Sequence, residues 1–270
     1  MPELPEVETT LRGILPHIHK KKITDIVIRQ SQLRWPVSPE MSIHAIGKTI
    51  RSGIRRGKYL LLEVANGHIL IHLGMSGSLR IISSDEPPLF HDHIDLRLGK
   101  ISLRYTDPRR FGCWLWIEGD PDEHKLLKDL GPEPLTENFD ADYLWQKSRG
   151  RSKTLKEFIM DNHIVVGVGN IYANESLFMS GIKPIRKASS LTKKEAVLWV
   201  EKIRFVLNRS IDQGGTTLRD FVGGDGKPGY FQQQLLVYGR GEEPCVNCAK
   251  PLKEIRLGGR SSVYCVSCQK

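Results

Sequence analysis

Short apolar runs dominate the first half of the chain. Each run is rich in Ile, Val, Leu or aromatic residues, and breaks that carry glycine or proline, such as Asn66-Gly67 and Pro87-Pro88, separate one run from the next. Short strands at regular spacing predict a β-sandwich or a barrel-like pair of sheets. The predicted strands are Lys22–Arg29, Tyr59–Val64, His68–Leu73, Ser78–Ile82, Ile101–Tyr105 and Cys113–Ile117.

A helix is predicted before the first strand. The chain begins MPELPEVET, and Pro5 suits the first turn of a helix because its missing N–H would be unpaired there in any case. Glu6 suits the positive end of the helix dipole. The apolar positions that follow continue the helix, and Pro16 is expected to end it.

The second half follows a helical period. Thr192 and Glu195 stand at capping-box spacing at the start of one helix. One apolar stripe continues that helix and predicts a face buried in the core. The stripe consists of Ala196, Val200, Ile203, Leu207 and Ile211. The change from strand to helix pattern falls near Leu130–Leu135, which is the predicted domain boundary.

The segment DNHIVVGVGNIY, residues 161–172, lies between predicted helices. Gly167 and Gly169 permit a tight turn, and Asn170 is placed to cap the next helix. A helix N-terminus with free amides can bind a phosphate. A plain helix–turn–helix hairpin explains the segment equally well, but its position in the basic half of the chain favours the phosphate site.

Composition and charge narrow the class of protein. The 270 residues are 39% hydrophobic and 26% charged, which is typical of a globular protein. No apolar run reaches the ~20 residues of a membrane span, and no secretory signal opens the chain, so a cytosolic protein is expected. The net charge is zero over residues 1–140 and +9 over residues 141–270. This asymmetry favours a polyanionic partner for the second half.

Four of the five cysteines form two CxxC pairs near the end of the chain, Cys245 with Cys248 and Cys265 with Cys268. Their spacing is typical of a zinc site, and disulfides are rare in a reducing cytosol. Four thiolates fill a tetrahedral shell, so one structural Zn²⁺ is expected. Cys113 is expected to be a small buried side chain. The His91-Asp-His93 motif is not expected to bind metal.

Several motifs resemble the formamidopyrimidine-DNA glycosylase family, bacterial base-excision enzymes related to endonuclease VIII. The resemblance spans essentially the whole chain, and PELPEVE favours the formamidopyrimidine branch. The motifs are PELPEVE, HLGMSGSLR, HDH, YTDPRRFG, LGPEPL, MDNHIVVGVGNIYANESLF, GGTTLRDF, DGKPGYF and VYGR.

The resemblance implies an α+β fold. An N-terminal helix and a two-sheet β-sandwich would form a catalytic domain over residues 1–133. A helical domain with a helix–two-turn–helix motif would occupy residues 134–228, and a four-cysteine zinc finger residues 229–270. The segment 214–231 resembles a loop that closes over the extruded base.

The resemblance also implies catalytic residues. Once Met1 is removed, Pro2 would present a secondary amine as the nucleophile. Glu3 would be the general acid and base, with Glu6 as a supporting acid. Lys58 would contact the lesion or a neighbouring phosphate, and Arg260 would bind the DNA backbone and assist the final elimination.

Six further residues would contact DNA. Met75, Arg109 and Phe111 map to the residues that fill the space left by the flipped base. Without the resemblance, the residue types of Met75 and Phe111 are explained equally well by burial in the core. The resemblance implies backbone contacts for three other residues: His91, Arg151 and Asn170. For Arg151 the assignment is shared with its basic neighbours.

The expected function is excision of oxidised purines, such as 8-oxoguanine and formamidopyrimidines, followed by β,δ-elimination. The expected partner is double-stranded DNA with oxidised bases or abasic sites, bound by a monomer in the bacterial cytosol. Two alternatives stay open. One is a glycosylase for oxidised pyrimidines of the endonuclease VIII type, and the other is a damaged-DNA-binding protein without catalysis.

Overall fold

The computed structural model describes residues 2–214 and 235–270. The described chain divides into two compact units. The first comprises residues 2–128 and 211–214, and the second comprises residues 129–210 and 235–270. The domain limits at 133 and 228 that the sequence suggests stay a prediction.

The first unit begins with helix α1, Leu4–Ile18. Pro5 lies in its first turn, as predicted. The expectation that Pro16 ends the helix is wrong, because Pro16 lies inside the last turn. Proline there removes one helical hydrogen bond, but Ile14 and Ile18 are fully buried on either side of it. Burial of these side chains holds the last turn in helical form.

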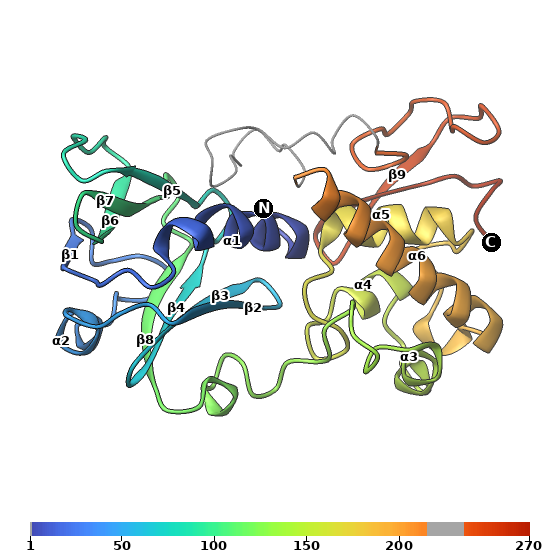
Figure 1. Cartoon of the computed structure of the whole chain (residues 1–270). Helices are drawn as coiled ribbons and strands as arrows, with labels where there is room; N and C mark the ends of the chain where they lie inside the picture. The colour runs from blue at the N-terminus through green and yellow to red at the C-terminus, as the bar shows by residue number, and fades with distance from the viewer. Residues whose placement is uncertain (1, 215–234) are drawn as a thin grey trace. The chain divides into compact units, whose positions relative to one another are not determined.

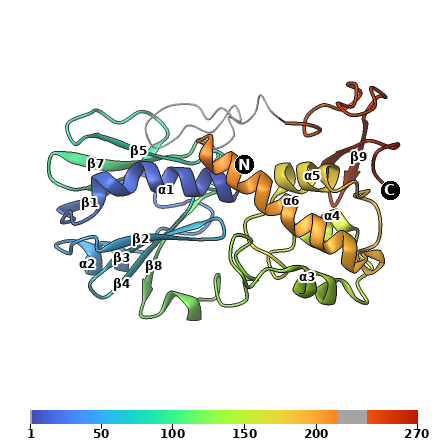
Figure 2. The ribbon, with the colours of Figure 1, turned by 45° about the vertical axis from the view of Figure 1, so that its right-hand side comes forward.

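Two antiparallel four-stranded sheets form the rest of the first unit. Figure 1 and Figure 2 show α1 between the strands of one sheet and those of the other. One core joins the three layers and includes Leu11 of α1 together with Leu62 and Leu103 of the two sheets. The first sheet has the order β1 (Asp25–Ile28), β6 (Asp92–Arg97), β7 (Ile101–Thr106) and β5 (Ser78–Ser83). The second has the order β2 (Ser52–Arg56), β3 (Tyr59–Val64), β4 (Gly67–His72) and β8 (Cys113–Glu118). A short helix, α2 (Glu40–Ala45), precedes β2 in the chain.

All six predicted strands are present, but β2 and β6 were not predicted. Strand β6 reads as polar because Asp92 and Asp95 interrupt it, yet both are buried. Arg104, 1% exposed, donates from Nε and Nη2 to the two oxygens of Asp95 at 2.8 Å each. Burial alone would raise the pKa of Asp95, but hydrogen bonds from Arg104 and Arg29 lower it to about 2. Because a buried ion pair replaces an apolar residue, β6 lacks the apolar pattern by which a strand is predicted.

The second unit contains helices and one short hairpin. The predicted capping box at Thr192 and Glu195 is confirmed, with the Glu195 amide donating to the Thr192 hydroxyl at 3.2 Å. The predicted cap at Asn170 is wrong, because Gly169 is the N-cap and Asn170 is the first helical residue. The helices are α3 (Ala141–Ser148), α4 (Leu155–Ile159), α5 (Asn170–Met179) and α6 (Lys193–Asp212). A short 3₁₀ helix lies at Ala188–Ser190, and another, Pro121–Glu123, belongs to the first unit.

The hairpin pairs β9 (Lys253–Leu257) with β10 (Arg260–Tyr264). Gly258 and Gly259 form its turn with φ angles of +55° and +74°. Two left-handed residues in a two-residue turn match the twist of a hairpin, and glycine adopts them at no steric cost. Within the described part of the chain, no helix combines the length and apolarity that a membrane span requires.

Candidate catalytic site, nucleic-acid interface and metal centre

Pro2 and Glu3 lie buried at the start of α1. Glu3 is the N-cap, and its amide donates to Glu6 Oε2 at 2.8 Å. The Glu3 side chain in turn accepts from the Glu6 amide, which completes a capping box. Glu3 is 2% exposed and Glu6 is fully buried. The two glutamates therefore fix the chain immediately after Pro2, beside the position of its amine.

Lys58 lies in the turn between β2 and β3, next to Gly57, which has a φ of +58°. The turn is tied to α1 by Arg55, whose Nε donates to Glu8 Oε2 at 2.8 Å. Arg55 also donates from Nη1 to the Gly57 carbonyl at 3.1 Å. Burial of Glu8 is outweighed by its two arginine partners, Arg55 first, so its pKa is lowered. These bonds join the half-buried Lys58 to the element that carries Pro2.

His72 at the end of β4 lies close enough to Lys58 to be affected by its charge. Its Nδ1 accepts the Gly74 amide at 3.0 Å, and its ring lies 4.9 Å from that of Tyr59. Burial lowers the pKa of His72 to about 4, and the positive charges of Lys58 and Arg34 contribute to the shift. At neutral pH the imidazole is therefore uncharged beside the Lys58 ammonium.

Acidification is expected to destabilise the first unit through His72. The unfolded chain binds this proton near pH 6.5 and the folded chain only near pH 4. Stability is therefore lost as the pH falls through this window, by about 2 kcal/mol between pH 7 and pH 5. Urea unfolding at both pH values measures the loss, and the control is His72→Asn, which keeps an acceptor for Gly74. An equal loss in the parent and in His72→Asn would contradict this assignment.

Met75, Arg109 and Phe111 come from two loops that touch. A Cβ added at Gly74 would lie 2.4 Å from the Phe111 carbonyl carbon, so one backbone packs directly on the other. Phe111 is 44% exposed, and the Arg109 guanidinium lies 4.9 Å from the centre of its ring. Met75 is half-buried. Phe111 is thus a surface side chain and not part of the core.

His91 lies just before β6 and is half-buried. Its ring meets the edge of Phe90 with 4.8 Å between centroids, and Phe90 is 90% exposed. The other histidine of the motif, His93, is 6% exposed, and its Nε2 lies 2.8 Å from the Asp107 carbonyl oxygen. The structure therefore uses His93 to hold a loop and leaves His91 near the surface.

In the second unit, Arg151 is exposed and Asn170 is half-buried at the first position of α5. Gly167 has a φ of +82°, which supports the predicted tight turn. The Asn170 carbonyl accepts Nδ2 of Asn174 at 2.6 Å. Helix α5 is ten residues long and follows Gly169, so its first turn lies where the sequence predicts a phosphate site, and phosphate binding there stays a prediction.

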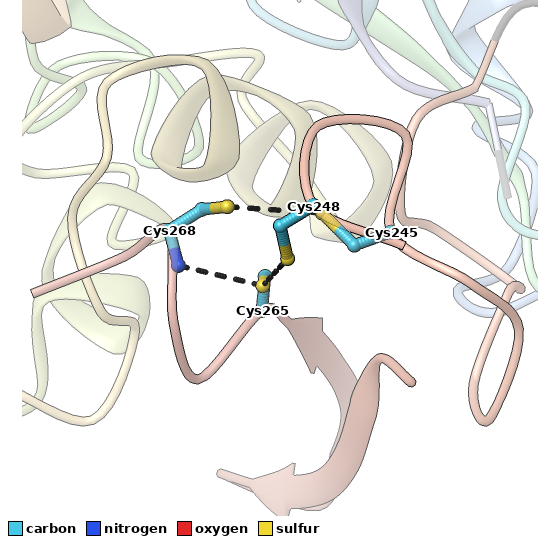
Figure 3. Close-up of side chains that lie close together, drawn as sticks. All are labelled: Cys245, Cys248, Cys265 and Cys268. Carbon is cyan, nitrogen blue, oxygen red and sulfur yellow. Dashed lines mark hydrogen bonds between the residues drawn. The ribbon is translucent and has the colours of Figure 1, made fainter. Parts of the chain in front are cut away.

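Figure 3 shows the sulfur atoms of the four paired cysteines gathered at one point. All four lie within 4.8 Å of one another, with Cys245 and Cys268 at 3.9 Å and Cys248 and Cys265 at 3.5 Å. Thiolates on a tetrahedral zinc ion at about 2.3 Å would lie about 3.8 Å apart, so the cluster fits one structural Zn²⁺. Burial would raise the pKa of Cys265, but amide hydrogen bonds from Cys268 and Ser267 help lower it to about 7. Among the described residues, these four cysteines are the one group of three or more His, Cys, Asp or Glu side chains placed to hold a metal ion.

Arg260 is exposed at the start of β10, and the hairpin that carries it is anchored to two helices. Lys156 of α4, only 1% exposed, donates to the Ser262 hydroxyl at 2.6 Å and to the Ser261 carbonyl. Asn174 of α5 accepts the Val263 amide at 2.8 Å. These buried groups hold the strand that presents Arg260.

Glu175 of α5 performs a similar task at the start of the finger. It is fully buried, and its carboxylate accepts the amides of Leu236, Val237 and Tyr238 at 2.8 to 2.9 Å. Burial raises its pKa against the effect of these hydrogen bonds. Sequence reasoning missed this residue and its neighbour Asn174. The signal was available, because both interrupt an otherwise apolar helix in IYANESLF.

Cys113 is fully buried, as predicted, and burial raises the pKa of its thiol to about 12.

The candidate residues divide between the units. The first unit carries Pro2, Glu3, Lys58, Met75, His91, Arg109 and Phe111, and the second carries Arg151, Asn170, Arg260 and the four cysteines.

Three family models together match most of the chain. They describe the formamidopyrimidine-DNA glycosylase N-terminal domain over residues 1–114, the H2TH domain of the same enzymes over residues 130–222, and a zinc finger found in FPG and IleRS over residues 242–270. A sandwich unit, a helical unit and a zinc finger in this order define the class as a zinc-finger DNA glycosylase. The chain belongs to the formamidopyrimidine-DNA glycosylase family.

Individual relatives agree over their full length. The chain is 65% identical to a formamidopyrimidine-DNA glycosylase of Cellvibrio japonicus and 58% identical to one of Saccharophagus degradans, with all of each chain covered. Its structure matches a complex of the Lactococcus lactis FPG mutant G226P with Fapy-dG-containing DNA, with a TM-score of 0.93, 33% identity and full coverage of both chains. It also matches the MutM (FPG) protein from Thermus thermophilus, with a TM-score of 0.90, 36% identity, and 99% and 98% of the two chains covered.

Proposed function

We propose that this protein is a bifunctional DNA glycosylase and AP lyase that removes oxidised purines through a Schiff base on Pro2. The observation that carries the proposal is the start of α1, where buried Pro2 adjoins a capping box of two buried glutamates. The names of the relatives support the same substrate class, and solved structures similar to this one hold Fapy-dG-containing DNA.

Pro2 would act as the nucleophile after Met1 is removed. An α-amine has a pKa near ~8, against ~10.4 for lysine, so a useful fraction is unprotonated at neutral pH. The amine attacks C1′, the damaged base leaves with the C1′–N bond electrons and a proton, and ring opening gives an iminium ion. The iminium withdraws electrons, so C2′ loses a proton and the 3′ phosphate departs; a second elimination releases the 5′ phosphate.

Glu3 would move protons at the sugar, giving one to the ring oxygen when the ring opens. Its buried carboxylate also stabilises the cationic iminium. Lys58 would neutralise a phosphate or assist proton removal, because its ammonium is a mobile point charge. Arg260 would hold a backbone phosphate through its fork of N–H donors.

The remaining candidate residues would hold the distorted duplex. Phe111 and Met75 would fill the space that the flipped base leaves, and Arg109 would bond the orphaned partner base. Three residues would bind phosphates along the backbone: His91, Arg151 and Asn170. The closing loop proposed at 214–231 lies almost wholly outside the described residues.

Charge supports DNA as the partner, and the bacterial sources of the relatives support the bacterial cytoplasm as the place of action. The excess of +9 lies within residues 141–270, which include α5 and the Arg260 strand. Contacts between these cations and phosphates release counterions, so affinity falls as salt is added.

A second candidate substrate class is the oxidised pyrimidines. One solved structure similar to this chain, at 33% identity and a TM-score of 0.92, is a complex of Lactococcus lactis Fpg with an oxidised-pyrimidine-containing DNA. A DNA-binding protein without catalysis is disfavoured because Pro2, Glu3 and Lys58 are all present.

Borohydride trapping tests the proposal. The mature protein should form a covalent adduct with a duplex that carries 8-oxoguanine opposite cytosine, and should do so faster than with a thymine-glycol duplex of the same sequence. Undamaged duplex is the control. Strand cleavage without an adduct would exclude the Schiff base, and faster trapping on thymine glycol would favour the pyrimidine substrate.

A further inference from the structure

Asp107 lies fully buried in the segment between β7 and β8, and its carboxylate accepts four hydrogen bonds. Oδ1 accepts the Ser76 hydroxyl at 2.8 Å and the Arg109 amide at 3.3 Å. Oδ2 accepts the Tyr105 hydroxyl at 2.8 Å and the Gly112 amide at 2.9 Å. The carboxylate is thus surrounded by donors that only a double acceptor can satisfy.

Three of these donors come from two different loops. Ser76 adjoins Met75, whereas Arg109 and Gly112 flank Phe111. The Ser76 oxygen also accepts the Arg109 amide at 3.2 Å, so Ser76 and Asp107 share one donor between them. This closed arrangement fixes each loop relative to the other.

The main chain of Asp107 reaches a third segment. Its amide donates to the His91 carbonyl oxygen at 3.1 Å, and its own carbonyl oxygen lies 2.8 Å from His93 Nε2. One residue therefore contacts the three segments that carry the proposed DNA contacts of the first unit: His91, Met75, and Arg109 with Phe111.

The surroundings leave little room for these segments to shift. A Cβ at Gly112 would lie 1.8 Å from the Tyr105 hydroxyl and 2.4 Å from the His72 carbonyl oxygen. Burial raises the pKa of Tyr105 well above its usual value, and the charge of Asp107 adds to this. The phenol is therefore protonated and donates to Asp107 at every physiological pH.

We infer that Asp107 is a positioning residue that holds the Met75 loop and the Arg109–Phe111 loop together as a single wedge for base extrusion. The inference rests on the proposed function, because a wedge is needed only if a base leaves the stack. It assigns Asp107 no contact with DNA. Asp107 acts through the two loops, and the amine chemistry at Pro2 does not depend on it.

Asp107→Asn tests the charge and the acceptor capacity while the shape is kept. The new NH₂ group would meet N–H and O–H donors, so at least two of them would lose their acceptor. Displacement of the wedge by about an ångström is expected to slow excision from a duplex by ~100-fold.

The matched pair is Ser76→Ala and Ser102→Ala. Both serines are buried, but Ser102 lies on β7 and bonds the hydroxyl of Ser84 at 2.9 Å. Ser76→Ala removes one hydroxyl from the link between the loops and is expected to slow duplex excision by ~10-fold, as loss of about 1.4 kcal/mol of positioning predicts. Ser102→Ala is expected to leave excision unchanged.

Two substrates separate a wedge defect from a general defect. Each variant is assayed on an 8-oxoguanine·cytosine duplex and on a single-stranded oligonucleotide with an abasic site, which needs no base extrusion. The expected result is slow duplex excision by Asp107→Asn and Ser76→Ala, with single-strand cleavage within about threefold of the parent. 2-Aminopurine placed opposite the lesion should brighten less with these variants than with the parent.

An equal loss on both substrates, or no loss on either, would overturn the inference. If Asp107→Asn does not fold, the comparison of Ser76→Ala with Ser102→Ala decides the question alone. A parent protein that gives no borohydride adduct with the 8-oxoguanine·cytosine duplex would instead show that the proposed function is wrong.

Discussion

A mature protein extended by two residues before Pro2 is expected to lose lesion excision and borohydride trapping by about 10⁴-fold or more, as for removal of a catalytic nucleophile. DNA affinity should change little, because the proposed phosphate contacts at Asn170, Arg151 and Arg260 belong to the second unit. Single-turnover cleavage of an 8-oxoguanine duplex measures the first effect, and fluorescence anisotropy on an uncleavable abasic duplex measures the second.

The reason is the change from amine to amide. In the extended chain the nitrogen of Pro2 is part of a peptide bond, and resonance removes its lone pair from nucleophilic use. The new terminal amine would lie two residues before the position that the capping box of Glu3 and Glu6 fixes. The buried carboxylates would remain, but they would have no iminium to stabilise.

Two controls keep this result specific. The matched protein that carries only Met1 before Pro2 exposes the amine when the methionine is removed, and it should show full activity. Pro16→Ala changes a proline at the other end of α1 and should leave activity unaltered. An extended protein that still excises and is still trapped at the parent rate would refute Pro2 as the nucleophile.

The sequence predicted the parts of the fold that follow simple periodicity. Six strands with apolar runs, the capping box at Thr192 and Glu195, and the paired cysteines are all present in the structure. In these segments local propensity and burial favour the same conformation, so the pattern is sufficient. The family motifs then added the candidate catalytic residues, whose roles stay predictions.

Periodicity failed where buried polar side chains carry the structure. Strand β6 was missed because Asp95 faces Arg104 inside the sheet, and no spacing rule foretells a partner in a different strand. The roles of Asp107 and Lys156 were missed for the same reason. Each is defined by bonds to residues far along the chain, such as Ser76 for Asp107 and Ser262 for Lys156. Pairings of this kind become visible only when the chain is folded.

Removal of zinc is expected to weaken binding to an abasic duplex by about 100-fold or more while the chemistry of Pro2 persists. The finger has a small core, in which Leu252 and Val263 pack against the cysteines. Fewer than about 40 residues rarely fold without a metal or a disulfide, and a structural zinc contributes about 10 to 16 kcal/mol. Without zinc the β9–β10 hairpin should lose its order and with it the contact of Arg260.

The measurement combines anisotropy on an uncleavable abasic duplex with zinc content after chelation. Cys248→Ser gives the same state without a chelator, and Cys113→Ala is the matched control because its thiol is buried in the first unit. The zinc-loaded Arg260→Ala variant keeps the folded finger, so its loss of binding measures the contribution of the arginine alone. The amine of Pro2 is followed by reductive trapping with a small aldehyde, which needs no DNA.

The two readouts are expected to diverge because the anchors of the hairpin and the amine lie on different elements. Lys156 and Asn174 hold β10 through helices of the second unit, whereas Pro2 depends on α1 of the first unit. Aldehyde trapping should therefore proceed at the parent rate in the zinc-free protein. Normal binding of abasic duplex by zinc-free protein would refute the proposed role of the finger, and loss of aldehyde trapping with the zinc would refute the independence of the two sites.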